Sequence, residues 1–236
     1  MTRRRWIADE VSGNIAALTG SHAEHISRVL RARVGQEFDI ATGREVRRGR
    51  VIRVENGRVE LELGELVAAV EIAHIILVLS IFKFDRMEWA IEKCTELGVT
   101  QIVPVIAQRT EKHLAAAAAK RVERWQRIAR QAAEQSRRTS PPEISAPMKL
   151  KDAVALVAEA RILLSESEQT VTLKDALAFQ AAGCIALAVG PEGGWTESES
   201  KLFREAGWIP ASVGSNILRA ETAAIAALSV VISELQ

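Results

Sequence analysis

The sequence predicts an α/β protein with two parts, a small β-rich module followed by a larger, mostly parallel sheet that helices cover on both faces. Short alternating runs, punctuated by Thr42-Gly43 and Asn56-Gly57, occupy the first part. Apolar strand-like runs then alternate with amphipathic helices, which is typical of a parallel sheet. Of the 236 residues 48% are hydrophobic, which is enough for a sizeable core. We expect the parts to span residues 1–71 and 72–236.

The N-terminal module is expected to contain one short helix and several strands. The helix covers His22 to Leu30, and the alternating runs lie at Glu37 to Ile40, Gly49 to Val54 and Val59 to Leu63. Asn-Gly between two such runs is a strong hairpin signal. Strands at this spacing predict a small barrel or sandwich.

The second part opens with Ile75 to Phe82, a continuous apolar run of the kind found in strands buried on both faces. The helix Asp85 to Leu97 follows, with Cys94 on its inward face, where we expect an inert thiol, and Gly98 as its C-cap. The other expected strands are Gln101–Ile106, Arg161–Ser165, Cys184–Val189 and Trp208–Val213. The other expected helices are Lys120–Arg138, Lys149–Glu159, Leu173–Gln180, Thr196–Ala206 and Ala220–Leu235.

Ligands of such sheets bind beyond the carboxyl ends of the strands, and three loops follow strand ends late in the chain. The first, Val189 to Trp195, is rich in glycine, and Thr196 to Glu199 forms a capping box after it. Glycine allows close backbone approach, and a helix start favours an anion, but a tight strand-to-helix turn explains the pattern slightly better. The second, Val213 to Thr222, brings polar residues to the start of an apolar helix, where function and capping explain them equally well.

The third loop, Leu164 to Glu166, is weak evidence alone, and Glu166 is expected to be solvated. The three loops would converge on one crevice if their strands are neighbours in the sheet. The closing helix, Thr222 to Leu235, is apolar around most of its circumference. A helix of this kind is deeply buried or lies at a subunit interface.

Several classes of protein are excluded or disfavoured. No apolar run reaches the ~18 residues of a membrane span, and the basic N-terminus lacks the apolar stretch of a signal peptide, so we expect no membrane association. Only two cysteines are present, which excludes a disulfide framework and favours a cytoplasmic protein. Gly-x-Gly-x-x-Gly, Walker and Gly-x-Ser-x-Gly motifs are absent. His22 and His25 lack a carboxylate pattern, so we expect no metal, and packing or RNA contact explains them better.

The net charge is only +1, yet 23 of the 31 basic residues are arginine. Arginine suits nucleic acid, and a GC-rich genome explains the bias equally well. Basic residues concentrate in Arg44 to Arg58 and in Glu111 to Arg138. A solvated helix face is the usual explanation, but segregated charge favours a polyanionic partner. The lack of tyrosine disfavours recognition of single strands by base stacking.

An ordered set of motifs resembles the bacterial 16S ribosomal RNA uracil-N3 methyltransferases of the SPOUT superfamily. The first motifs are His25-Ile26-Ser27-Arg28-Val29-Leu30-Arg31 with Gly35, Lys83 with Asp85-Arg86-Met87-Glu88-Trp89, and Ile91 to Val99. The later ones are Glu123 to Arg138 with Pro142-Glu143-Ile144, Gly190 to Gly194, and Ile217 to Ala223. The resemblance covers nearly the whole chain, although Val213-Gly214-Ser215-Asn216 departs from the family's pattern.

The resemblance implies an N-terminal PUA-like β-barrel that binds RNA and a SPOUT methyltransferase domain with a trefoil knot. It implies S-adenosylmethionine as methyl donor, a homodimer packed near the cofactor sites, and methylation of uridine N3 in the decoding region of 16S rRNA in the small ribosomal subunit. The alternative is a noncatalytic ribosome-assembly factor that binds rRNA through the same surfaces.

The resemblance also suggests roles for individual residues. Uracil N3 is a poor nucleophile until it loses its proton, so the reaction needs a base or stabilisation of the anion. Arg219 is our candidate for binding that anion or the target phosphate, and Glu221 or Glu192 for the base. The expected cofactor-binding residues are Leu164, Ser165, Gly190, Glu192, Gly193, Val213, Gly214, Ile217, Leu218 and Thr222. The expected RNA-binding residues are Arg3, Arg4, His25, Arg28, Arg31, Lys83, Arg86, Arg124, Arg127, Arg137 and Arg138.

Overall fold

A computed structural model describes residues 5–43, 45–69, 73–178 and 183–235, which form two compact units. The first unit comprises Met1–Glu71 together with Ala133–Ser140. The second comprises Ile72–Ala132 and Pro141–Gln236. The chain thus divides after residue 71, but a later segment joins the first unit, and no pattern in the sequence indicated this.

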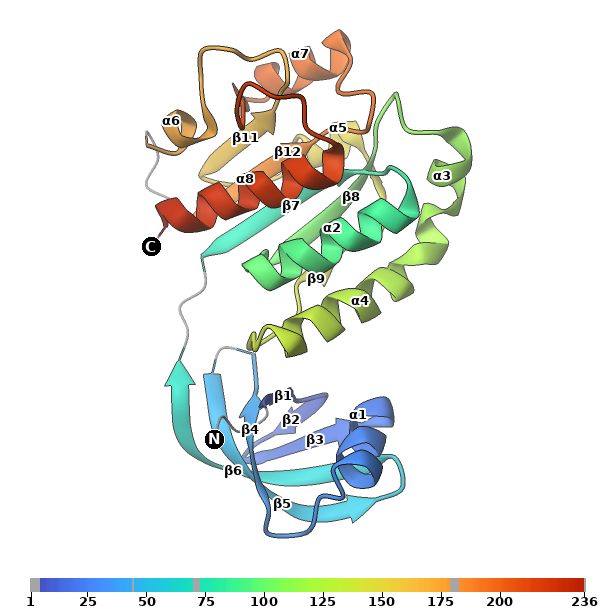
Figure 1. The fold of residues 1–236 in the computed structure, drawn as a ribbon, viewed down its shortest axis with the longest axis vertical. Coiled ribbons are helices and arrows are strands. Elements are labelled where there is room, and N and C mark those ends of the chain that lie inside the picture. The colour runs from blue at the N-terminus through green and yellow to red at the C-terminus, as the bar shows by residue number, and fades with distance from the viewer. Residues whose placement is uncertain (1–4, 44, 70–72, 179–182, 236) are drawn as a thin grey trace. The chain divides into compact units, whose positions relative to one another are not determined.

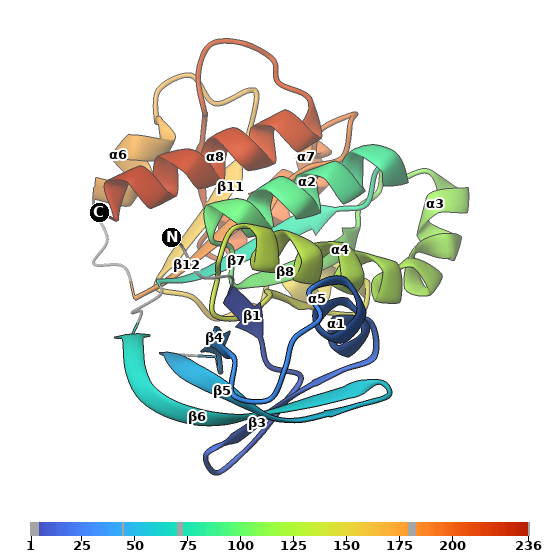
Figure 2. The ribbon, with the colours of Figure 1, turned by 60° about the horizontal axis from the view of Figure 1, so that its bottom comes forward.

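The first unit is built on a six-stranded sheet in the order β1-β4-β5-β6-β3-β2, which curls into a half-barrel (Figure 2). Glu55 pairs with Arg58 across Asn56-Gly57, so the predicted hairpin is confirmed. The three strands before residue 20 were not predicted because they are short and because β1 pairs with β4 in parallel, without a local turn signal. The strands are β1 Arg5–Ile7, β2 Glu10–Ser12, β3 Ile15–Thr19, β4 Glu37–Ala41, β5 Glu45–Glu55 and β6 Arg58–Ala69.

The helical segment of this unit is not the single α-helix that the sequence predicts. It consists of α1 (Gly20–Glu24) and a π-helical turn, η1 (His25–Val29), with Ile26 buried in the core. His22 lies between two carboxylates, with Nδ1 at 3.2 Å from Asp9 Oδ2 and Nε2 at 2.7 Å from Glu134 Oε1. These contacts within the first unit agree better with a packing role for His22 than with metal ligation.

The segment 133–140 completes the core of the first unit. The side chain of Ala133 is buried in a cluster with Ile7, Ala41 and Val46. The guanidinium of Arg5 donates to the carbonyl oxygen of Arg137 at 2.5 Å, and Glu134 binds His22 as described above. Apolar packing and polar contacts thus both hold this segment in the first unit.

The second unit contains a parallel sheet in the order β10-β8-β7-β12-β11-β13, with β9 also paired to β8 (Figure 1). Its central strand, β7, alternates between two cores, since Ile75, Leu77 and Leu79 face one cluster and Ile76 and Val78 the other. The predicted burial on both faces is therefore confirmed. The strands are β7 His74–Ser80, β8 Gln101–Ile106, β9 Glu143–Ile144, β10 Met148–Lys149, β11 Ala160–Leu164, β12 Cys184–Val189 and β13 Ile209–Ala211.

Helices cover both faces of this sheet, with α2 and α8 packed side by side on one of them (Figure 1). Residues of α2, α4, α6 and α8 bury apolar side chains in one core, and residues of α5 and α7 in the other. The helices are α2 Phe84–Leu97, α3 Lys112–Ala117, α4 Val122–Gln135, α5 Leu150–Ala153, α6 Leu173–Ala178, α7 Glu197–Glu205 and α8 Ala220–Glu234.

Two predicted helices are wrong in extent. The helix expected from Lys120 to Arg138 begins as a 3-10 turn, η2 (Ala118–Arg121), and its α-helical part ends at Gln135. The helix expected from Lys149 to Glu159 is α-helical only over Leu150–Ala153, and Val157 beyond it is 89% exposed, so apolar packing does not extend it. The sequence pattern also did not predict α3, which begins at Lys112 and ends within the alanines at positions 115–119.

Two smaller predictions are confirmed by the structure. Gly98 caps α2 with a φ of 115°, and the thiol of Cys94 is fully buried, which raises its pKa to about 12 and leaves it inert. Among the described residues, no helix combines the length and apolar character that crossing a bilayer would require. The trefoil knot stays a prediction.

Candidate functional site

A cavity of about 240 Å³ lies at the carboxyl ends of β11, β12 and β13, the strands that precede the three loops. The strands β12, β11 and β13 are consecutive neighbours in the sheet, so the condition for convergence of the loops is met. The described residues that line the cavity are Leu164, Ser165, Glu166, Ser167, Val189, Gly190, Pro191, Glu192, Gly194, Trp195, Ser200, Ala211, Ser212, Val213, Gly214, Asn216, Ile217, Leu218, Ala220 and Ala223.

Most of the predicted cofactor-binding residues lie around this cavity. Those that line it are Leu164, Ser165, Gly190, Glu192, Val213, Gly214, Ile217 and Leu218. Gly193 and Thr222 do not line it. The carbonyl of Gly193 instead accepts a hydrogen bond from Arg109, and Thr222 is exposed in the first turn of α8.

The three glycines of the first loop are required by side chains that pass against them. A Cβ atom at Gly190 would lie 3.2 Å from Nε1 of Trp195, and one at Gly193 would lie 3.2 Å from Cδ of Arg109. At Gly194 it would lie 3.0 Å from Oε1 of Glu166, and the φ of +69° is one that other residues rarely adopt. The preference for glycine thus comes from close packing around the loop.

We call Val189–Trp195 the glycine loop. Arg109 and Glu199 hold it in place. Nη1 of Arg109 donates to the carbonyls of Gly193 and Trp195. The buried carboxylate of Glu199 accepts from the backbone N–H groups of Gln108 and Thr196 and completes the predicted capping box. Neither Arg109 nor the cavity-lining position of Glu166 was predicted, because both depend on strands that are distant in sequence.

The cavity does not have the charge of an anion site, the less favoured of the two explanations of the glycine-rich loop. Its described lining includes the carboxylates of Glu166 and Glu192 but no lysine, arginine or histidine. The buried Nε1–H of Trp195 has no acceptor among the described residues and stands on the cavity wall. Apolar side chains, hydroxyl groups and two carboxylates together suit a cationic ligand with an apolar ring and hydroxyl groups, as S-adenosylmethionine is.

The candidate catalytic residues take three different positions. Arg219 is the exposed N-cap of α8, between the cavity-lining residues Leu218 and Ala220, and has no ion pair among the described residues. Glu192 lines the cavity, whereas the side chain of Glu221 is 5% exposed and does not line it. Nη1 of Arg86 lies 3.7 Å from Glu192 Oε1 and 3.6 Å from Glu221 Oε1.

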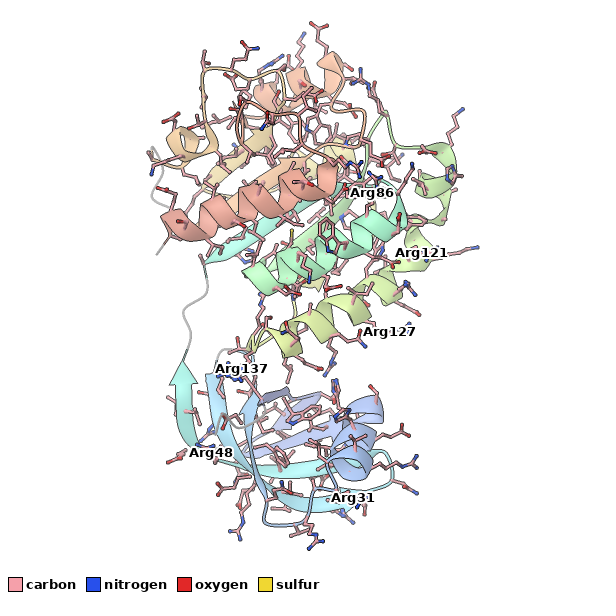
Figure 3. The ribbon with its side chains drawn as sticks, in the orientation of Figure 1. Arg31, Arg48, Arg86, Arg121, Arg127 and Arg137 are labelled. Carbon is pink, nitrogen blue, oxygen red and sulfur yellow. The ribbon has the colours of Figure 1, made fainter. Side chains whose placement is uncertain are left out.

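The predicted RNA-binding residues of the second unit fall into two groups. Arg86 (labelled in Figure 3) faces the two carboxylates just described. Arg124 donates twice to Glu88, at 2.7 and 2.8 Å. Lys83 and Arg127 are exposed, and neither has a carboxylate partner among the described residues. Only the second group carries charges that no carboxylate of the described residues already pairs.

In the first unit, Arg3 and Arg4 lie outside the described residues, and His25, Arg28, Arg31 and Arg137 are exposed. Arg138 is partly buried, which lowers its pKa to about 10, so it still carries a charge at neutral pH. Arg31 and Arg137 are the only described non-glycine residues with positive φ, at 52° and 60°. Such backbone conformations are costly for arginine and are concentrated at functional sites.

The arginine-rich stretch from Arg44 to Arg58 is less basic than its composition suggests. Carboxylates lie within 4 Å of four of its arginines. The pairs are Arg47 with Glu45, Arg48 with Asp39 and Glu65, Arg53 with Glu55, and Arg58 with Glu10 and Glu60. Much of this stretch is therefore neutralised within the sheet.

Comparison with known proteins gives a consistent result. A family model described as an RNA methyltransferase domain matches residues 70–232. A protein of Synechocystis named ribosomal RNA small subunit methyltransferase E is 35% identical over 90% of this chain and 71% of its own. A protein of the same name from Aquifex aeolicus is 30% identical over 96% of this chain and 97% of its own.

Solved structures show the same similarity. The crystal structure of a ribosomal RNA small subunit methyltransferase E from Neisseria gonorrhoeae, bound to S-adenosyl methionine, has a TM-score of 0.85 and 31% identity, over 99% of this chain and 98% of that one. A methyltransferase from Legionella pneumophila in complex with the same cofactor has a TM-score of 0.83 and 28% identity over the same shares.

Proposed function

The chain belongs to the ribosomal RNA small subunit methyltransferase E family, and on that premise we propose that it transfers a methyl group from S-adenosylmethionine to N3 of a uridine in the decoding region of 16S rRNA. The observation that carries the proposal is the cavity at three neighbouring strand ends, whose only charged lining groups among the described residues are carboxylates. A ribosomal RNA substrate places the reaction in the cytoplasm.

Each wall of the cavity offers a distinct contact to the cofactor. When bound, S-adenosylmethionine supplies an electrophilic methyl group on a positively charged sulfur. Leu164, Val213 and Leu218 offer apolar surface for its adenine, and Ser165 and Glu166 offer hydroxyl and carboxylate groups for its ribose. The carboxylates of Glu166 and Glu192 favour a positively charged ligand in this cavity, because opposite charges attract over such short distances.

The residues at the mouth of the cavity would activate the acceptor. Glu192 is the better placed of the two candidate bases, because it lines the cavity and Glu221 does not. Arg219 is exposed beside the cavity and has no competing carboxylate among the described residues, which suits it to stabilise the uracil anion as N3 loses its proton. Holding both reactants in line contributes further to the rate.

Binding of S-adenosylmethionine distinguishes this function from a noncatalytic assembly factor. At a hundredfold excess over its dissociation constant, the cofactor should stabilise the native chain by about 2.7 kcal/mol and raise its melting temperature by roughly 5 to 10 °C. Differential scanning fluorimetry measures the shift, with ATP as a control that carries adenosine but a negative charge. An equal shift with ATP, or none with the cofactor, would favour the assembly-factor alternative.

The target base is tested in the cell. Mass-spectrometric mapping of 16S rRNA from a strain that lacks this chain should show one uridine without its N3 methyl group. Re-expression of the wild-type chain should restore the modification. A methyl group lost from another base or ring atom would reassign the specificity while leaving the cofactor site in place.

The RNA surface is expected to depend on arginines with free charge. Arg127→Gln should weaken RNA binding and reduce the slope of log K against log salt concentration by about 0.7 to 0.9 for one lost phosphate contact. Arg124→Gln is the matched control on the same helix, because Arg124 is already paired with Glu88 and its loss should leave the slope unchanged. Equal slopes for wild type and Arg127→Gln would make Arg127 part of a solvated face.

We also infer a homodimer that packs near the cofactor cavities. Six of the fifteen residues of α8 are buried within its own chain, and several of its other apolar residues are only partly buried. Further support comes from the exposed apolar side chains of Trp89 on α2, Ile217 and Leu218 (48%, 82% and 36% exposed). Sedimentation equilibrium should give twice the chain mass for the wild type, and Trp89→Glu with Ile217→Glu should shift it towards the monomer. A wild-type monomer at micromolar concentration would contradict this.

A further inference from the structure

One guanidinium connects two walls of the cavity. Arg86 lies in the first turn of α2, and its Nη1 reaches Glu192 of the glycine loop at 3.7 Å and Glu221 in the first turn of α8 at 3.6 Å. Figure 3 shows Arg86 at the end of α2 that lies beside the start of α8. Three elements that are distant in sequence thus meet at one side chain.

Glu221 depends on this arginine for its charge compensation. Its side chain is 5% exposed, and Arg86 is its only ionic partner among the described residues. Its second oxygen, Oε2, is buried and has no hydrogen-bond partner there. Burying a carboxylate without a partner is costly, and the start of α8 offsets only part of that cost through the helix dipole. The ion pair with Arg86 therefore stabilises the start of α8 through Glu221, its buried carboxylate.

The other end of the bridge holds the cofactor loop. Glu192 lines the cavity, and so do Ala220 and Ala223 of α8, which lie close in sequence to Glu221. Arg109 holds the following part of the glycine loop through the carbonyls of Gly193 and Trp195. Arg86 is thus the described residue whose ion pairs join the glycine loop to α8.

We propose that Arg86 is a positioning residue for methyl transfer, which sets the spacing between the glycine loop and the start of α8 on which cofactor binding depends. The proposal rests on the function proposed above. It replaces the expectation that Arg86 contacts RNA, because its charge is already shared between two carboxylates.

A double-mutant cycle tests the bridge. Neither Arg86 nor Glu221 lines the cavity, so an effect of either on cofactor affinity must be transmitted through the elements they hold. By calorimetry, Arg86→Gln and Glu221→Gln should each weaken S-adenosylmethionine binding about tenfold, and the double variant should also be about tenfold weaker, not a hundredfold. Effects that multiply, or affinities within twofold of wild type, would overturn the proposal.

The double variant also separates positioning from stability. Arg86→Gln leaves a buried carboxylate without a partner and should lower the melting temperature without ligand, and adding Glu221→Gln should recover part of that loss. If Arg86→Gln does not fold, the double variant still tests the proposal. A double variant that binds S-adenosylmethionine as tightly as the wild type does would overturn it. Arg86→Lys, which keeps the charge, should retain more affinity than Arg86→Gln.

Lys93 provides a matched control on the same helix. It also bridges two carboxylates, Glu92 and Glu96 at 2.7 and 2.8 Å, but none of the three lines the cavity. Lys93→Gln should leave cofactor affinity unchanged, and an equal loss there would reduce the role of Arg86 to that of any salt bridge of α2. A wild-type chain that does not bind S-adenosylmethionine would refute the proposed function. In that case the melting temperatures of the single and double variants would still measure how strongly Arg86 and Glu221 interact.

Discussion

Replacing Arg219 by alanine is expected to slow methyl transfer by about 10²- to 10³-fold while leaving the affinity for S-adenosylmethionine within a few-fold of wild type. Arg219 does not line the cavity, and it is exposed between two residues that do, so the cofactor can bind without it. Its guanidinium is free to stabilise negative charge on the acceptor. Removing one such group at a developing anion typically costs about 10²- to 10³-fold in kcat.

Single-turnover methylation of 16S rRNA in small subunits measures the rate, and calorimetry measures cofactor affinity. Arg204→Ala is a suitable control, because Arg204 is also exposed on a helix of this unit but lies on α7 and does not line the cavity. Equal losses of rate and cofactor affinity in Arg219→Ala would assign Arg219 to cofactor binding. A normal rate would remove it from the reaction.

Replacing Gly194 by valine should weaken cofactor binding at least about tenfold, because a left-handed backbone costs an L-residue about 1–2 kcal/mol and relief of this strain would move a loop that lines the cavity. Its φ is +69°, and a Cβ atom would stand 3.0 Å from the carboxylate of Glu166. Gly194 and Glu166 both line the cavity, so either the loop or the carboxylate must move. Calorimetric titration with S-adenosylmethionine measures the loss.

Gly57→Val is the matched control for backbone strain. Gly57 has a φ of +77° in the hairpin of the first unit, and a Cβ atom there would meet nothing within 4 Å. Gly57→Val should therefore lower the melting temperature but leave cofactor affinity unchanged. If Gly194→Val binds the cofactor as tightly as Gly57→Val does, close packing around the glycine loop is not needed for binding.

Local patterns predicted much of the fold. The Asn56-Gly57 hairpin, the C-cap at Gly98 and the capping box at Thr196 depend on neighbours in sequence, and each is present. The strand β1 and the short strands β9 and β10 were missed, because each pairs in parallel with a distant strand and carries no turn signal. Helix extents were wrong where tertiary packing overrides propensity.

At the candidate site, the positions that follow strand ends could be predicted and the contacts between them could not. The glycine loop and Leu218 line the cavity because parallel strands end at a common edge. Arg109 and Arg86 act across loops and helices that are distant in sequence. Glu166 is exposed, as expected, and also lines the cavity, which was not predicted. The net charge of a segment likewise gave no indication of the cross-strand partners of Arg48 and Arg58.

Residues 133–140 belong to the first unit, and this limits how that unit can be separated from the chain or joined to another protein. A fragment that stops at residue 71 would lack Ala133, which fills the space among Ile7, Ala41 and Val46, and Glu134, whose carboxylate lies 2.7 Å from Nε2 of His22. Such a fragment should aggregate or melt early, because it leaves an apolar gap and removes one of the two carboxylate partners of His22. The first unit therefore cannot be transferred to another protein as residues 1–71 alone, and a graft would also have to include residues 133–140.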